Sequence, residues 1–224
     1  MSALERQGRT EPPLLPSPLH PWLGLIAALA ALVVAGLGIL YAGHGGPGGV
    51  DERVGEAVDG RRPTWWRQLA LATDFLGEPL GAAALIATVV AGCLLLRRPR
   101  AAVLVVTAAG LTVTATTLLK HVVGRTINGG YLSYPSGHTA FLASVALLLA
   151  LLAAGRLALG RTTGTLLVFA AALAAALAMG WAQVALGAHY PTDVLGGWCT
   201  ALAVTPATAW TVDRLSGTVR RGRS

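Results

Sequence analysis

His189 and Asp193 stand four positions apart on either side of Pro191, near the C-terminal end of the chain. Proline at the first position of a helix costs no hydrogen bond, so we expect a helix to begin at Pro191. The spacing then lets the carboxylate fix one imidazole nitrogen and leave the other free as a nucleophile. The alternative interpretation is an ordinary interfacial histidine at a helix start.

The segment Pro135-Ser136-Gly137-His138 precedes a long apolar run. Ser136 could simply cap the following helix, with Gly137 as a turn residue. The functional alternative is that the helix N-terminus presents backbone N–H groups to an anion while His138 donates a proton. Phosphate is the anion that such a site suits best.

Lys120 is the only lysine of the chain, and it lies near the end of another apolar run. Snorkelling to a membrane interface explains many such lysines, but an ionisable group in a spanning segment also indicates a functional site. Arg125, five residues later, could close a bidentate clamp on phosphate oxygens. The three segments together therefore predict phosphoryl chemistry.

The elements that must position these residues are apolar helices. The 224 residues are 54% hydrophobic and only 12% charged, whereas about a quarter of the residues of a soluble domain are charged. The apolar runs approach the length needed to cross a bilayer. We predict an all-α integral membrane bundle of six transmembrane helices, with spans near 22–42, 80–96, 101–121, 138–154, 164–187 and 191–211.

Three other segments frame this bundle. Residues 1–21 contain several prolines and predict an irregular cytoplasmic arm. Residues 51–78 mix charged and apolar positions around two tryptophans, a pattern that predicts an amphipathic helix at the outer interface. The membrane domain is expected to cover 22–212, with a basic cytoplasmic tail over 213–224.

The basic residues predict the orientation. Arginine and lysine in short loops mark the cytoplasmic side, and six spans place both termini on one side. Of the seventeen basic residues, eleven lie on the side of the termini, namely Arg6, Arg9, Arg97, Arg98, Arg100, Arg156, Arg161, Arg214, Arg220, Arg221 and Arg223. We therefore expect a multi-pass protein of the cell membrane with cytoplasmic termini and the candidate site on the outer face.

The net charge of +7 does not indicate a nucleic-acid partner, because the basic residues are dispersed rather than gathered on one face. His121, His138, His189 and Asp193 could in principle meet at a zinc ion, but they form no compact ligand motif. We expect no metal and no other cofactor. The expected partners are the bilayer and a lipid substrate, and the sequence indicates no oligomeric state.

The three segments together resemble the type 2 phosphatidic acid phosphatase superfamily of membrane lipid phosphatases, which shares its core with vanadium haloperoxidases. The family signature is lysine, six residues and Arg-Pro; then Pro-Ser-Gly-His; then Ser-Arg, five residues, histidine, three residues and aspartate. The second part matches at Pro135 to His138, and the third keeps His189 and Asp193. The order of the segments covers nearly all of residues 80–212.

Both signature arginines are absent. Ile127 and Asn128 stand in place of Arg-Pro, and Ala182 and Gln183 stand in place of Ser-Arg. Arg125 lies two residues early and is a candidate substitute for the first arginine. Gln183 can donate a hydrogen bond but carries no charge, so the phosphate affinity or the leaving group is expected to differ.

The resemblance implies a metal-independent hydrolysis of a lipid phosphate or pyrophosphate through a phosphohistidine. His189 would attack, Asp193 would orient it, and His138 would protonate the leaving oxygen. Phosphate would be bound by Lys120, Arg125, Ser136, Gly137 and Gln183. The first candidates for the substrate are a polyprenyl pyrophosphate of the undecaprenyl type and phosphatidic acid. The alternative is a catalytically weak relative that binds or transports a phospholipid.

Overall fold

The structure is a computed structural model that describes residues 13–59 and 64–221, and of these residues 59 and 216–221 only as backbone. Within these residues the chain forms eight α-helices, one 3-10 turn (Ser17–Leu19) and one hairpin. The helices are α1 His20–Leu40, α2 Gly49–Asp59, α3 Thr64–Asp74, α4 Pro79–Leu95, α5 Pro99–Val123, α6 Gly137–Arg156, α7 Arg161–Ala185 and α8 Pro191–Arg221. The hairpin pairs β1 (Thr126–Ile127) with β2 (Tyr131–Leu132) in antiparallel register.

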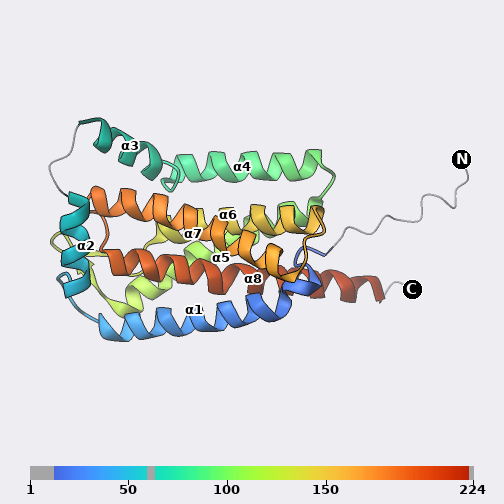
Figure 1. Ribbon diagram of the computed structural model, residues 1–224, viewed down its shortest axis with the longest axis horizontal. Helices are drawn as coiled ribbons and strands as arrows, with labels where there is room; N and C mark the ends of the chain where they lie inside the picture. The colour runs from blue at the N-terminus through green and yellow to red at the C-terminus, as the bar shows by residue number, and fades with distance from the viewer. Residues whose placement is uncertain (1–12, 60–63, 222–224) are drawn as a thin grey trace, which may run out of the picture.

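Six long helices lie along a common direction, and α2 lies across one end of the bundle (Figure 1). Helix α6 is central because it packs against α5, α7 and α8. Helix α1 packs on α8, while α4 packs on α5. Helices α5 and α7 end where α6 and α8 begin, so their connecting loops meet at the end that α2 crosses (Figure 1).

Proline and serine define the helix starts. Pro79, Pro99 and Pro191 each open a helix, where a missing N–H leaves no bond unmade. Ser136 caps α6 by accepting a hydrogen bond from the amide of Thr139. The sequence-based prediction of a helix start at Pro191 is confirmed.

Within the described residues, four helical segments are long and apolar enough to cross a membrane by length and composition, namely Ser17–Leu40, Pro99–Val123, Gly137–Arg156 and Arg161–Ala185. A fifth span results if α3 and α4, which meet at a 58° bend, are counted as one. Many large apolar side chains point outward, as a lipid solvent allows, including Ile39, Leu95 and Val122. The all-α membrane bundle is confirmed, and the six long helices agree roughly with the six predicted spans.

The structure differs from the prediction in the segments that frame the bundle. Where one amphipathic helix is expected over 51–78, there are two, α2 and α3. Helix α8 continues past the expected end of the membrane domain at 212 to Arg221. The predicted arm lies outside the described residues over 1–12. Its last part is packed, since the amides of Leu14 and Leu15 donate to the Asp213 carboxylate at 3.0 and 2.9 Å.

Candidate active site

The candidate residues gather at the end of the bundle that α2 crosses (Figure 1). Lys120 lies in the last turn of α5, and His138 lies in the first turn of α6. His189 lies in the short loop between α7 and α8, and Asp193 lies in the first turn of α8. The fold therefore brings together the three segments that the sequence analysis combined.

Asp193 faces the imidazole of His189 across 3.6 Å, measured from Oδ2 to Nδ1. The carboxylate is fully buried, and it also accepts the backbone amide of Tyr190 at 3.0 Å. Burial lowers the pKa of His189, against the opposing effect of Asp193, while the nearby charges of Lys120 and His138 act in the direction of burial. A neutral imidazole beside a buried carboxylate is the state that a nucleophilic histidine requires.

Arg125 contacts Asp193 of this pair and is fully buried. Its Nη1 donates to Asp193 Oδ1 at 2.7 Å and to Thr192 Oγ1 at 2.6 Å, and its Nη2 donates to Asp51 Oδ2 at 2.7 Å. The guanidinium carbon lies 3.9 Å from the Tyr41 ring centroid. Both terminal nitrogens are thus bonded to the protein. This geometry favours a positioning role toward Asp193 over the phosphate contact predicted from the sequence.

Asp51 on α2 is a site component that sequence reasoning missed. Its carboxylate accepts the amides of Gly48 and Thr192 at 3.0 and 2.9 Å, in addition to Arg125. Burial alone would raise the pKa of Asp51, but these hydrogen bonds outweigh it and lower the pKa. No sequence signal links Asp51 to Arg125, which lies 74 positions away.

Ser136 caps α6, which is the first of the two roles that the sequence analysis considered for it. Its hydroxyl donates to Thr139 Oγ1 at 3.0 Å, and its own amide donates to the Asp193 carbonyl at 2.9 Å. Gly137 is the first residue of α6, where helix N-termini attract anions. A Cβ on Gly197 of α8 would lie 2.3 Å from the Ser136 carbonyl oxygen, so this glycine allows the two helix starts to approach. The loop is thereby fixed against α8.

Lys120 is partly buried, and its Nζ donates to the carbonyl of Leu132 in β2 at 3.1 Å. The hairpin that carries Leu132 turns through Asn128, Gly129 and Gly130, all with positive φ. The Leu132 contact uses one of the three donors of an ammonium group. Lys120 can therefore still donate to a phosphate beside His189.

The PAP2 superfamily matches residues 82–216, which is more than half of the chain. The chain belongs to the PAP2 superfamily. The fold is similar to the crystal structure of a transmembrane PAP2-type phosphatidylglycerolphosphate phosphatase from Bacillus subtilis. The TM-score is 0.63 at 20% identity, over 88% of this chain and 96% of the other. The comparison with curated proteins gives no match.

The PAP2 site departs from the family signature at Gln183, and the structure places a carboxylate there. Gln183 is almost fully buried, and its Nε2 donates to Asp74 Oδ1 at the end of α3. The amide side chain therefore contacts an acidic group of the protein where the signature has an arginine. Asp74 lies before the matched PAP2 region and was not predicted from the sequence.

Asp74 and Glu78 also face the proposed proton donor. His138 Nε2 lies 3.7 Å from Asp74 Oδ1 and 3.6 Å from Glu78 Oε1. Within the described part of the PAP2 chain, these three residues form the group whose side chains could share a metal ion. The histidine set considered from the sequence is not gathered in this way, since His121 is exposed and bonds the Thr117 carbonyl of its own helix.

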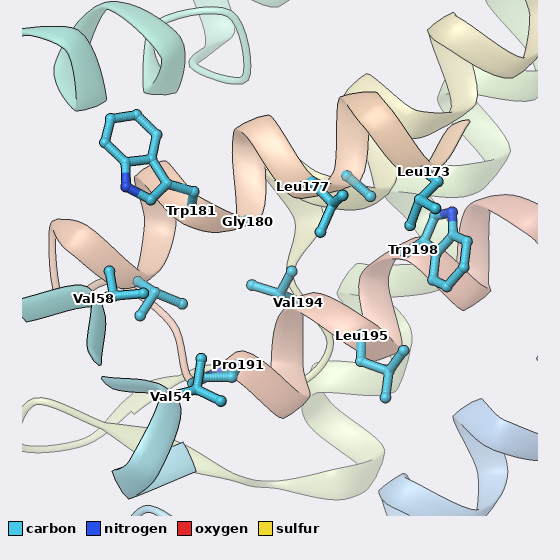
Figure 2. A pocket seen from close by; sticks show the side chains of 12 residues that line it. Val54, Val58, Leu173, Leu177, Gly180, Trp181, Pro191, Val194, Leu195 and Trp198 are labelled. Atoms are coloured by element: carbon cyan, nitrogen blue, oxygen red, sulfur yellow. The ribbon is translucent and has the colours of Figure 1, made fainter. Parts of the chain in front are cut away.

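An apolar cavity of about 350 Å³ lies beside the PAP2 site between α2, α7 and α8 (Figure 2). It begins at Pro191, two positions after His189, and Val54 and Val58 of α2 line it. Val194 and Leu195 line the α8 side, a different helix face from that of Asp193. The cavity thus adjoins the first turn of α8 on a face other than that of Asp193, and it extends along α7 and α8 as far as Leu173 and Trp198.

Proposed function

We propose that this PAP2 protein is a phosphatase that hydrolyses a lipid phosphate or pyrophosphate through a phosphohistidine, with no metal in the reaction. The arrangement of His189 against the buried Asp193 carboxylate, at the bundle end that also carries His138, is the observation that carries the proposal. A protein that only bound lipid would have no physical need for a neutral, oriented histidine at this place. Membership of the PAP2 superfamily supports the same reaction.

The proposed reaction has two steps. The free nitrogen of His189 attacks phosphorus, a P–N bond forms, and the P–O bond to the lipid breaks in line. His138 gives its proton to the departing oxygen, and Asp193 stabilises the imidazolium of the phosphohistidine. Water then attacks phosphorus, His138 takes the proton of that water, and inorganic phosphate leaves with restoration of His189.

Two groups stabilise the charge on the phosphate oxygens in this proposal. Lys120 supplies a full positive charge, and the N-terminus of α6 at Gly137 supplies backbone N–H groups. Ser136 contributes by holding the loop, because its own amide is bonded to Asp193. Arg125 contributes through Asp193, and Gln183 through Asp74.

The proposed substrate is a lipid phosphate at the outer interface, with a polyprenyl pyrophosphate of the undecaprenyl type or phosphatidic acid as first candidates. The apolar cavity beside Pro191 supports a substrate with an apolar tail (Figure 2). The structurally similar protein from Bacillus subtilis is a phosphatidylglycerolphosphate phosphatase, which adds that glycerolipid to the panel to be tested.

A second candidate function is binding or transport of a phospholipid by a catalytically weak relative. The observation that favours it is the environment of Gln183, where an uncharged amide and the Asp74 carboxylate occupy the place of a signature arginine. Such a site holds a phosphate dianion less strongly than one with two arginines. Turnover distinguishes the two functions.

The test is phosphate release by the detergent-purified chain from polyprenyl and glycerolipid phosphates with a chelator present. We expect release that His189→Ala abolishes, while His121→Ala, at an exposed histidine of α5, releases phosphate at the wild-type rate. Rapid acid-free quenching should trap a labelled phosphohistidine. Wild-type turnover in His189→Ala would exclude this nucleophile, and no release from any lipid would favour the phospholipid-binding function.

A further inference from the structure

Three side chains from two parts of the fold meet at the bend between α3 and α4. Asp74 ends α3, Glu78 precedes α4, and His138 comes from the first turn of α6. One ligand atom from each of the three can be chosen so that all lie within 4.8 Å of one another. Imidazole and carboxylates together form a ligand set that zinc and related transition metals accept.

Both separations exceed hydrogen-bond length, as the 3.6 Å between His189 and Asp193 does, and they match the spacing of ligands around a shared cation. With metal–ligand distances of about 2.0 to 2.2 Å, two ligands of a tetrahedral zinc ion lie about 3.4 Å apart. The measured distances from His138 Nε2 are 3.7 Å to Asp74 and 3.6 Å to Glu78. An imidazolium bonded to a carboxylate would instead lie at about 2.7 to 2.9 Å. His138 Nε2 is buried and makes no hydrogen bond within the described residues.

The surroundings hold Asp74 and His138 in place. Gln183 donates to Asp74 Oδ1, as a hydrogen-bonding partner of a metal-binding carboxylate would. Gly77 donates its amide to the Asp74 carbonyl at 2.8 Å, and a Cβ at Gly77 would lie 2.3 Å from Cδ2 of His138. The turn therefore packs directly on the imidazole. Half of the Glu78 side chain is exposed, which gives an ion access from outside the bundle.

A cation would lower the repulsion between the two carboxylates at this side of the site. Asp74 and Glu78 bring two carboxylates, and Gln183 adds no charge where the family signature has an arginine. Arg125 is bonded to Asp51 and Asp193, so it does not offset them. A divalent cation held by three protein atoms would compensate both carboxylates.

We propose that Asp74, Glu78 and His138 form a binding site for a divalent transition metal of the zinc type, and that an ion bound there switches the phosphatase off. Inhibition follows because a metal ion on Nε2 prevents the imidazole from carrying the second proton that makes it a proton donor. The inhibitory part rests on the proposed function, in which His138 is the proton donor. Binding of the metal does not depend on it.

Binding is tested by titrating Zn²⁺ into the detergent-purified full chain and measuring heat and bound metal. We expect one ion per chain. Loss of a supporting hydrogen bond costs roughly 10- to 100-fold in metal affinity, so loss of a direct ligand in Glu78→Gln should cost at least about 100-fold. The matched control is Glu56→Gln, an exposed glutamate of α2 that should bind as the wild type does.

Asp74→Asn is the second ligand variant and should weaken binding to a similar degree, with size-exclusion elution confirming that each variant is folded. Absence of Zn²⁺ binding by the wild type would overturn the site. Equal affinity of the wild type, Glu78→Gln and Asp74→Asn would also overturn it, because the ion would then bind elsewhere.

The inhibitory role is tested by the ratio of phosphate release with and without Zn²⁺ for each variant. Zn²⁺ should inhibit the wild type and the Glu56→Gln control over the range in which it binds, and Glu78→Gln should need about 100-fold more. Binding without inhibition would overturn the regulatory part. A chain that binds Zn²⁺ but hydrolyses no lipid would instead refute the proposed function and leave the binding site standing.

Discussion

Replacement of Arg125 by leucine should destabilise the whole site end of the bundle. The side chains of Arg125, Asp51 and Asp193 are all fully buried, and the guanidinium contacts both carboxylates at 2.7 Å. Arg125→Leu leaves two buried carboxylates without a cation. Removal of one partner from a buried ionic network costs about 3 to 5 kcal/mol. For a chain of this size, that loss lowers the unfolding midpoint by roughly 6 to 20 °C.

The partner variant Asp51→Asn should lower the free energy of unfolding by less than Arg125→Leu does. The Arg125–Asp193 pair remains, and the lost interactions are hydrogen bonds to a charged acceptor, worth about 1.5 to 3 kcal/mol. In the double variant one buried carboxylate fewer is left without a cation. Its loss of stability should therefore be smaller than the sum of the two single losses by at least about 1 kcal/mol. This coupling reports the direct contact between Arg125 and Asp51.

The assay combines the thermal unfolding midpoint in detergent with the kinetics of phosphate release. Arg125→Leu should lower kcat strongly with little change in KM, because it displaces Asp193 and not the substrate. Arg53→Leu, at an exposed arginine of α2, is the control and should unfold near the wild-type temperature. If Arg125→Leu unfolds like the wild type and only raises KM, then Arg125 binds phosphate as the sequence predicted, and the positioning argument is refuted.

Two further predictions concern the two histidines. Burial lowers the pKa of His189 below its ordinary value near 6.5, and attack requires the neutral form present above that pKa. The acid limb of kcat/KM should therefore fall below pH 6.5, and a limb at or above that value would contradict the burial argument. Gly77→Ala should lower kcat by about 100-fold, because its Cβ displaces the His138 ring. Gly92→Ala in α4, with open space around it, is the control. If Gly77→Ala turns over as fast as this control, the turn moves to accommodate the Cβ and the His138 ring is not displaced.

The sequence predicted the fold well because hydropathy and proline act locally. Long apolar runs define the bundle helices, and prolines mark three of their starts, Pro79, Pro99 and Pro191. The number of helices in 51–78 was wrong, because the mixed polarity of an amphipathic segment indicates a helical face without showing where the helix breaks. The Gly77-Glu78-Pro79 sequence before α4 was a readable signal of the bend.

The site was predictable only where its residues follow a compact motif. The structure places His138, His189 and Asp193 at one end of the bundle, as the order of the predicted spans indicated. The buried arginine was expected to meet an anion, and it does, but the anions are carboxylates of the protein. Which anion an arginine meets is decided by tertiary packing, because Asp51 lies 74 positions from Arg125. One sequence contains no local signal for such a pair.

The segment before the matched PAP2 region supports both proposed catalytic histidines. Asp51 of α2 holds Arg125, which holds the carboxylate facing His189. At the other side of the site, Asp74 and Glu78 face His138. These three carboxylates all precede residue 82, where the family match begins. In the proposed function the motif residues define the type of reaction, while Asp51, Asp74 and Glu78 set the charge around each histidine. Substitution of Asp51 should accordingly change the rate, and substitution of Asp74 or Glu78 the metal sensitivity, without changing the motif itself.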